Sequence, residues 1–140
     1  MRLRIEIGDG VAQTTWRAGD NFVGWSDKLH GGLIATLLDE VMAWAPSSYD
    51  SWAVTAELSV RYRSPAIPGE ELTAIGRVSE RRRRIYVVIG EVRGADGRMV
   101  AEGRITPATR PKPTHPPEPV KPLPGMTASE FIIAERESER

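Results

Sequence analysis

Residues 30–46, HGGLIATLLDEVMAWAP, decide how the rest of this chain can fold. From position 31 the large apolar side chains recur at the 3.6-residue period of an α-helix and fill one half of a helical wheel. They are Leu33, Ile34, Leu37, Leu38, Val41, Met42, Trp44 and Ala45. Proline cannot continue a helical hydrogen-bond pattern, so Pro46 predicts that a helix over residues 31–45 ends there. One side of this helix therefore needs a broad apolar partner.

The other half of the wheel is unusual because it carries Asp39 among the small side chains of Ala35, Thr36 and Ala43. No lysine or arginine occurs between positions 31 and 45, although a solvent-facing helix side normally carries such long charged residues. The small residues indicate that this side is covered by something that approaches closely. A carboxylate in such a cleft suits a general base, and a solvated helix residue is the alternative interpretation of Asp39.

His30, Gly31 and Gly32 stand at the start of this helix. A helix N-terminus has unpaired backbone N–H groups and a partial positive charge, and glycine lets a ligand approach those donors. A carbonyl oxygen that gains negative charge during a reaction would be stabilised there. His30 either acts as a base or caps the helix and packs against it. Glu40 points about 100° away from Asp39, so we expect only Asp39 in the site and Glu40 in an interface or a salt bridge.

Most of the remaining sequence up to residue 106 has the polar–apolar alternation of β-strands. Residues 3–7 and 11–16 flank a Gly-Asp-Gly turn and predict a hairpin, and four strand-like runs follow the helix. In residues 52–62 strict alternation puts Thr55 on the polar face of its strand. The order predicts an α+β fold in which one helix covers a curved antiparallel sheet, with the last four strands as a meander.

Composition excludes several classes of protein. The 140 residues suffice for one domain, and 19 basic against 19 acidic side chains give no net charge, so we expect no nucleic-acid partner. The absence of cysteine excludes disulfides, thiolate metal sites and cysteine nucleophiles. The N-terminus lacks the apolar segment of a secretory signal, and no stretch has the apolar run of a membrane span. We therefore expect a cytoplasmic protein without membrane contact.

Eight of the 11 prolines lie between Pro107 and Pro124 and divide the chain into two parts. Proline lacks the N–H that strands and helices need, so this stretch is expected to be extended and linker-like. We therefore predict a domain over residues 1–106 and a proline-rich tail over residues 107–140. Thr127 and Glu130 have the spacing of a capping box, which predicts a short helix within the tail.

Together these features resemble the hotdog-fold acyl-CoA thioesterases, in particular the PaaI-type branch. The resemblance spans about residues 22–106. It rests on His-Gly-Gly, a carboxylate nine residues after the histidine, the small-residue helix side, and a strand that ends in Tyr62 before a Ser-Pro turn. It implies a long central helix wrapped by a curved antiparallel sheet, and a homodimer or homotetramer with active sites at the dimer interface. It also implies hydrolysis of an acyl-CoA thioester, with coenzyme A as part of the substrate and with no separate cofactor or metal.

Position by position, the resemblance gives Asp39 the role of the catalytic carboxylate, as general base or as nucleophile. Gly31 matches the residue whose N–H polarises the thioester carbonyl. Thr55 stands where related enzymes place a residue that holds the attacking water and comes from the neighbouring subunit. His30 supports this site, and Gly32 takes part in substrate binding.

The loop before the helix and one later turn complete the predicted site. Trp25 is the aromatic residue best placed to line an acyl pocket, while Gly24 stands where some family members have an asparagine or glutamine. The resemblance implies that Arg83 and Arg84, within the arginine run of residues 81–84, bind the phosphates of coenzyme A. A solvated turn or a nucleic-acid contact are the alternatives for this run. For the whole chain, the alternatives to a thioesterase are a non-catalytic acyl-CoA-binding or regulatory module and a hotdog hydratase or dehydratase.

Overall fold

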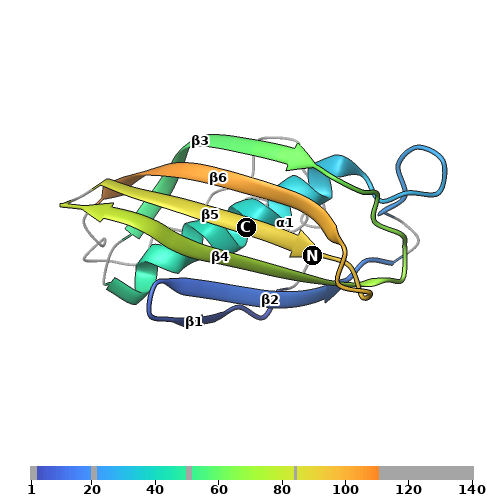
Figure 1. The fold of residues 1–140 in the computed structure, drawn as a ribbon, viewed down its shortest axis with the longest axis horizontal. Helices are drawn as coiled ribbons and strands as arrows, with labels where there is room; N and C mark the ends of the chain where they lie inside the picture. Colours follow the sequence, from blue (N-terminus) through green and yellow to red (C-terminus); the bar gives the residue numbers. More distant parts are fainter. Residues whose placement is uncertain (1–2, 20–21, 50–51, 84, 111–140) are drawn as a thin grey trace, which may run out of the picture. The chain divides into compact units, whose positions relative to one another are not determined.

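The computed structural model describes residues 3–19, 22–49, 52–83 and 85–110, and Figure 1 shows how its elements are arranged. A hairpin of β1 (Glu6–Gly8) and β2 (Val11–Arg17) precedes α1 (Gly31–Trp44) and the short 3-10 helix η2 (Ala45–Tyr49). Four longer strands complete the fold: β3 (Trp52–Tyr62), β4 (Glu71–Arg82), β5 (Ile85–Arg93) and β6 (Met99–Arg110). The last strand therefore runs four residues past residue 106, and the predicted tail helix lies outside the described residues.

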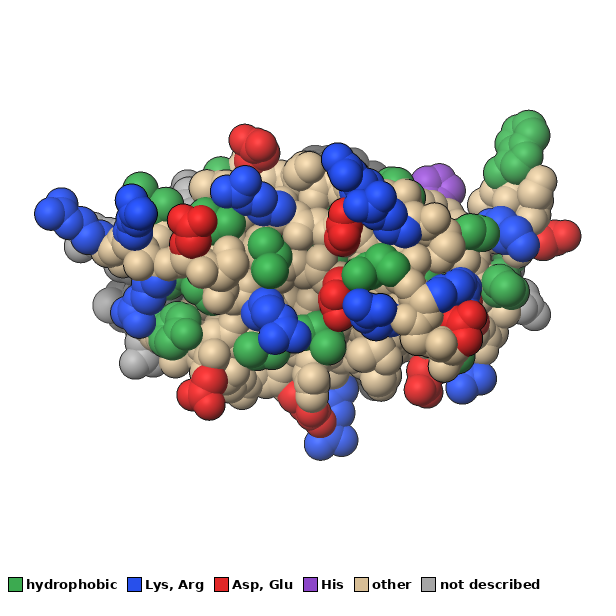
Figure 2. Space-filling model, in the orientation of Figure 1, with side chains coloured by type: hydrophobic (Ala, Val, Ile, Leu, Met, Phe, Trp, Pro, Cys, Tyr) green, Lys and Arg blue, Asp and Glu red, His purple; other side chains and the backbone are tan. Residues whose placement is uncertain are grey.

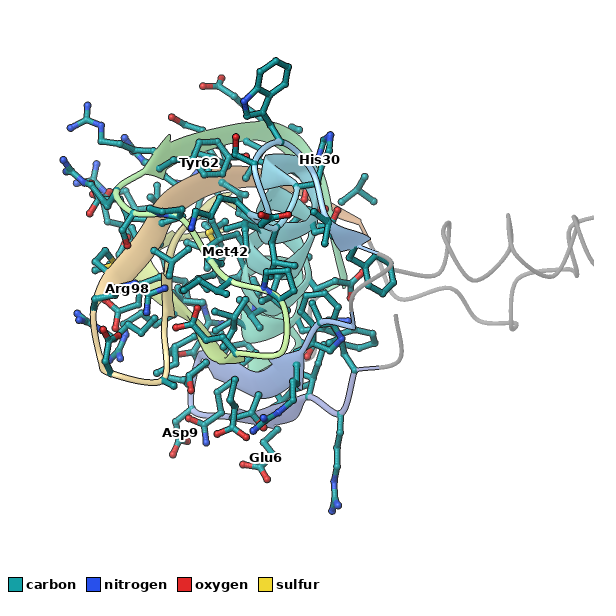
Figure 3. The ribbon with its side chains drawn as sticks, turned by 90° about the vertical axis from the view of Figure 1, so that its right-hand side faces the viewer. Glu6, Asp9, His30, Met42, Tyr62 and Arg98 are labelled. Carbon is teal, nitrogen blue, oxygen red and sulfur yellow. The ribbon has the colours of Figure 1, made fainter. Side chains whose placement is uncertain are left out.

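The six strands form one antiparallel sheet in the order β1-β2-β4-β5-β6-β3, with α1 on one of its faces (Figure 1). Figure 3 shows the strands curving around this helix. The predicted α+β fold, one helix covered by a curved antiparallel sheet, is confirmed. The helix predicted over residues 31–45 agrees with α1 to within one residue, because the backbone passes into η2 at the residue before Pro46. Neither described helix is long and apolar enough to cross a membrane.

The predicted meander of the last four strands is wrong. β3 does not pair with β4 but with β6, through pairs such as Tyr62 with Ala101, while β4 pairs with β2. The eight residues that join β3 to β4, Arg63–Glu70, are too many for a tight hairpin, and two of them are prolines without an N–H. This connection crosses between non-adjacent strands, so β3 lies at one edge of the described sheet.

A β-bulge in β3 also changes which side chains face the helix. Thr55 is paired with Pro107 and Glu57 with Thr106, so Ala56 is an extra residue in this strand. Because one extra residue inverts the alternation, Thr55 lies on the same side of β3 as Tyr62, and both bond to α1. The prediction of strict alternation over residues 52–62, with Thr55 on the polar face, is therefore wrong.

Three glycines let α1 lie close to the sheet. Gly76, Gly90 and Gly103 are cross-strand neighbours on β4, β5 and β6. A Cβ on Gly76 would lie 2.5 Å from the carbonyl oxygen of Val41, and one on Gly90 would lie 2.8 Å from Cγ of Met42. Both distances are shorter than real atoms allow, so no side chain fits beneath this part of the helix. The row fixes α1, which carries Asp39, at a short distance from β4, β5 and β6.

Candidate functional site

The N-terminus of α1 is capped by His30. Its Nδ1 accepts a hydrogen bond of 3.0 Å from the Gly32 N–H, and its carbonyl oxygen accepts one of 3.0 Å from the Leu33 N–H. An accepting Nδ1 carries no proton, so Nε2 is the ring nitrogen left to donate. This geometry makes His30 the N-cap of α1, which is one of the two interpretations that its place in the sequence left open. The Gly31 N–H has no acceptor among the described residues and is the donor at the helix start that a ligand can use.

The two glycines of the motif touch different side chains. A Cβ on Gly32 would lie 3.1 Å from Nδ1 of His30, so Gly32 leaves room for the cap. A Cβ on Gly31 would lie 3.3 Å from the Tyr62 ring, and the Tyr62 hydroxyl donates a hydrogen bond of 2.7 Å to the Gly31 carbonyl oxygen. Figure 3 shows His30 and Tyr62 both in the upper part of the view. Tyr62 therefore belongs to this site.

The candidate carboxylate lies further along the helix. Thr55 Oγ1 on β3 donates a hydrogen bond of 2.7 Å to Asp39 Oδ1, and both residues are half-buried. The structure brings these two residues together within one chain, whereas the resemblance implied a threonine from the neighbouring subunit. A carboxylate held by a hydroxyl and still partly open to solvent can meet a water molecule or a substrate.

The neighbouring carboxylate has a different environment. Glu40 is only 5% exposed, and its Oε2 accepts a hydrogen bond of 3.2 Å from the indole N–H of Trp44. It points into the fold while Asp39 remains accessible, as the helical geometry predicted for adjacent residues. Among the described residues, no group of three or more histidine, aspartate or glutamate side chains could hold a metal ion.

An open groove of about 340 Å³ begins at Gly31 and Tyr62. Its remaining walls are mostly apolar and come from Leu29, Ile34, Pro65, Ala66 and Val100, together with Arg63 and Ser64. A separate hollow of about 380 Å³ lies on the sheet face turned away from α1, which Figure 2 shows as a mixture of acidic and basic side chains. That second hollow contains none of the predicted site residues, so the groove beside Gly31 is the candidate for substrate binding.

An ion pair stabilises the loop between β3 and β4, which forms one wall of this groove. Arg98 binds the carboxylate of Glu70 and donates a hydrogen bond of 2.9 Å to the Pro65 carbonyl oxygen, while Glu70 accepts one of 3.0 Å from the Ile67 N–H. The hydrogen bonds from Arg98 are the main reason that the pKa of Glu70 lies below its ordinary value, against the opposing effect of burial. The wall therefore depends on a charged carboxylate.

Three other predicted residues lie away from this groove or are not described. Trp25 is 90% exposed at a tight turn closed by the 2.7 Å hydrogen bond from the Gly24 N–H to the Lys28 carbonyl. Arg83 is exposed in the turn between β4 and β5, with a left-handed φ of 54°. Arg84 lies outside the described residues.

The arginine turn lies at the opposite end of the sheet from Gly31. The Tyr62 end of β3 pairs with β6 at Ala101, whereas β5, which follows the turn, begins at Ile85 and pairs with β6 at Ala108. Seven residues of strand correspond to about 23 Å. One chain alone therefore does not bring Arg83 to the start of α1.

Gly31 and Asp39 are also separated within one chain. Eight helical residues rise by about 12 Å, so the Gly31 N–H and the Asp39 carboxylate of the same helix do not reach one carbonyl group. The described residues thus contain two candidate half-sites: the helix start with Gly31, His30 and Tyr62, and the Asp39–Thr55 pair.

Comparison with known proteins places this geometry in context. The family model of the thioesterase superfamily matches residues 27–101. Human acyl-coenzyme A thioesterase 13 is 31% identical over 81 residues, which are 56% of this chain and 58% of that protein. The chain thus spans less than two thirds of the length of the curated relatives it matches.

Solved structures share the fold. A Streptococcus mutans protein crystallised with acetyl CoA is 25% identical, with a TM-score of 0.76 over 80% of this chain and 91% of its own. The Escherichia coli PaaI protein is 23% identical, with a TM-score of 0.72 over 76% of this chain and 82% of its own. The family match confirms the expected resemblance to the hotdog thioesterases, and the PaaI structure shares their fold.

Proposed function

Because this chain belongs to the thioesterase superfamily, we propose that it hydrolyses an acyl-CoA thioester to the free acid and coenzyme A. The observation that carries the proposal is the Asp39 carboxylate, held at 2.7 Å by the Thr55 hydroxyl on the small-residue side of α1. A carboxylate oriented in this way is suited to activate water or to attack a carbonyl carbon. The proposed reaction needs no cofactor, and we propose a cytoplasmic location for it.

The proposed reaction adds water across the thioester bond. Asp39 takes a proton from water held by Thr55 while the water oxygen bonds to the carbonyl carbon. The Gly31 N–H at the positive end of α1 stabilises the negative charge that moves onto the carbonyl oxygen. The C–S bond then breaks, and the thiolate of coenzyme A leaves and takes up a proton. In the nucleophilic alternative, Asp39 forms an anhydride that water hydrolyses.

We propose that each complete site forms between two copies of the chain. The 12 Å rise between the two half-sites, about eight residues of helix, supports this proposal because one helix cannot supply both to one carbonyl. β3 is an edge strand of the described sheet, with Val54 and Leu58 exposed on it. Thr55 and Tyr62 are seven residues apart on this strand, and their midpoint lies between Leu58 and Ser59. If β3 of two copies pairs antiparallel about a twofold axis at this midpoint, Thr55 of one copy lies opposite Tyr62 of the other.

The same twofold arrangement accounts for the distant residues. It reverses the ends of the sheet, so the arginine turn of one copy comes to the end where α1 of the other begins. We propose that Arg83 and Arg84 bind the phosphates of coenzyme A from that position, and that Trp25 lines the site across the interface. His30 and Gly32 maintain the helix start that presents the Gly31 N–H.

The direct test measures thiol release from a panel of acyl-CoA substrates by the wild type and by Asp39→Asn. Asp9→Asn is the matched control, because it removes a carboxylate from an exposed hairpin turn where asparagine tolerates the positive φ of 50°. We expect turnover by the wild type and by the control and a loss of at least about 100-fold for Asp39→Asn. Full turnover by Asp39→Asn would contradict a catalytic role for this residue. Tight binding of acyl-CoA by the wild type without turnover would favour the non-catalytic module.

A subunit-mixing experiment tests the shared site. Gly31→Pro removes the N–H at the first helical position, which accepts proline, and His30 already has the extended ψ of 129° that proline requires before it. Mixed dimers of Gly31→Pro with Asp39→Asn contain one intact site, formed by Gly31 of one copy and Asp39 of the other. We expect each variant alone to be inactive and the mixture to regain activity. No recovery in verified mixed dimers contradicts a site made from both copies.

A further inference from the structure

Tyr62 makes two different contacts with one residue. Its hydroxyl donates the 2.7 Å hydrogen bond to the Gly31 carbonyl oxygen, and its ring lies so close that a Cβ on Gly31 would be 3.3 Å from it. Glycine has more backbone freedom than any other residue, so a residue whose N–H must point in one direction needs such a restraint. The bond from β3 fixes the peptide group between Gly31 and Gly32 to the sheet. Through this peptide group it also fixes the direction of the Gly31 N–H, which belongs to the preceding peptide group.

The rest of the Tyr62 side chain forms a wall of the groove. It is 53% exposed, whereas Leu29, Ile34, Ala66 and Val100, which line the other sides, are 7% exposed or less. Among the described residues no acidic side chain lines the groove, and the one basic residue that does, Arg63, is bound to Glu102 at 2.6 Å. A charged acyl group would lose water there without gaining a free partner, while an apolar group would bury its surface.

We propose that Tyr62 holds Gly31 in position for thioester hydrolysis and, as a wall of the adjoining groove, selects uncharged apolar acyl groups. The inference rests on the proposed function, since it takes the Gly31 N–H as the group that binds the thioester carbonyl. The hydroxyl acts through Gly31, so in this respect Tyr62 is a positioning residue. The ring contacts the acyl group and sets the shape of the groove.

Tyr62→Phe tests the positioning role, because it removes the hydroxyl and keeps the ring. Thr14→Val is the matched control: Thr14 Oγ1 also donates a 2.7 Å hydrogen bond to a backbone carbonyl, that of Arg4, on β2 away from the groove. We expect Tyr62→Phe to lower kcat about five- to tenfold at unchanged KM, and Thr14→Val to leave kcat unchanged. Equal kcat values for Tyr62→Phe and the wild type, or equal losses in both variants, overturn the positioning role.

Tyr62→Ala tests the selection role with hexanoyl-CoA, phenylacetyl-CoA and succinyl-CoA. We expect the wild type to prefer the two uncharged acyl groups over succinyl. The substitution should shift kcat/KM toward the bulkier phenylacetyl group, relative to hexanoyl, by about tenfold. Circular dichroism and light scattering verify that the variant keeps its fold and oligomeric state. A wild-type preference for succinyl-CoA, or the same preference profile in a folded Tyr62→Ala, overturns the selection role.

Calorimetric binding of the same three thioesters separates this inference from the proposed function. If the wild type binds them without turnover, the proposed function and the positioning role are both wrong, and the dissociation constants decide the selection role. A profile that favours the uncharged groups and changes in Tyr62→Ala supports selection, and an unchanged profile overturns it. If no acyl-CoA binds, both the proposed function and the inference are wrong.

Discussion

Thr55 reaches Asp39 across the space between an edge strand and the helix, and its hydroxyl donates a 2.7 Å hydrogen bond to the carboxylate. A bulge at Ala56 explains why Thr55 shares the helix-facing side of β3 with Tyr62, although the two residues are an odd number of positions apart. A carboxylate that accepts this bond has one oxygen oriented by the protein. Its second oxygen has no partner among the described residues and is open to a substrate or water.

Thr55→Val should lower kcat about 10- to 100-fold, because it removes the hydroxyl that orients Asp39 while keeping the shape of the side chain. Since Thr55 is half-buried on an edge strand, we expect the melting temperature to change little. Thiol-release kinetics and circular dichroism measure the two effects. Thr55→Ser, which keeps a hydroxyl, is the control, and full activity in Thr55→Val would contradict a role in turnover.

Gly31→Pro should lower kcat by about 100-fold or more, because it removes the one donor of the helix start that the described residues leave free. Gly31→Ala adds a Cβ at the same place, 3.3 Å from Tyr62, but keeps the N–H. It therefore reports the cost of crowding alone. We expect much higher activity from Gly31→Ala than from Gly31→Pro, and similar losses in both would mean that crowding explains the effect.

Deletion of Ala56 should be tolerated, although deletions within strands usually shift every side chain to the other face. Without Ala56, the pairs of Thr55 with Pro107 and of Glu57 with Thr106 become successive pairs of a regular ladder. Thr55 then still faces Asp39. Deletion of Ser59 is the contrast, because it turns the preceding part of β3 over. Activity assays should rank the Ala56 deletion well above the Ser59 deletion, and the reverse order would contradict the register.

Gly76→Ala should destabilise the fold more than Gly103→Ala. The added carbon at position 76 meets the backbone of Val41 at 2.5 Å, whereas at position 103 it meets Cε of Met42, the end of a flexible side chain, at 3.0 Å. We expect a loss of about 2–4 kcal/mol in the free energy of unfolding for the first variant and about 1 kcal/mol for the second. Urea unfolding measures both, and equal losses would contradict the close approach of the helix.

The ion pair of Glu70 with Arg98 predicts a pH dependence of stability. The pKa of Glu70 is lowered in the folded state, mainly by hydrogen bonds from Arg98, so this carboxylate stabilises the fold above its unfolded pKa of 4.5. That contribution is lost as the pH falls through the lower folded value. Melting temperatures from pH 7 to pH 3 should therefore fall more steeply for the wild type than for Glu70→Gln. Parallel curves would contradict a contribution from Glu70.

Local patterns predicted some features of this molecule and could not predict others. The helix over residues 31–45 was predictable because its period and Pro46 lie within one stretch of sequence. The neighbours of β3 were not, because strand pairing joins residues that are far apart in the chain. The face of Thr55 was wrongly predicted since a bulge leaves no mark in the alternation of residue types.

The residues of the candidate site also differ in whether local sequence could predict them. Asp39, Gly31 and His30 stand close together in sequence and were all identified there. Tyr62 was noted only as part of a family pattern, because its role depends on a contact with Gly31, 31 residues earlier. Helix geometry predicted that Glu40 points away from Asp39, as the structure shows, but nothing local indicated its burial or its hydrogen bond from the Trp44 indole.

The glycine row beneath α1 has a consequence for how substitutions in this protein should be interpreted. Gly76 has no reacting group, yet we expect a methyl group there to push α1 away from the sheet and so to shift Asp39 relative to Thr55. A mutational scan scored by activity alone would rank Gly76 beside Asp39. The amount of folded protein in the cell distinguishes them, because it falls with the first substitution and stays constant with the second.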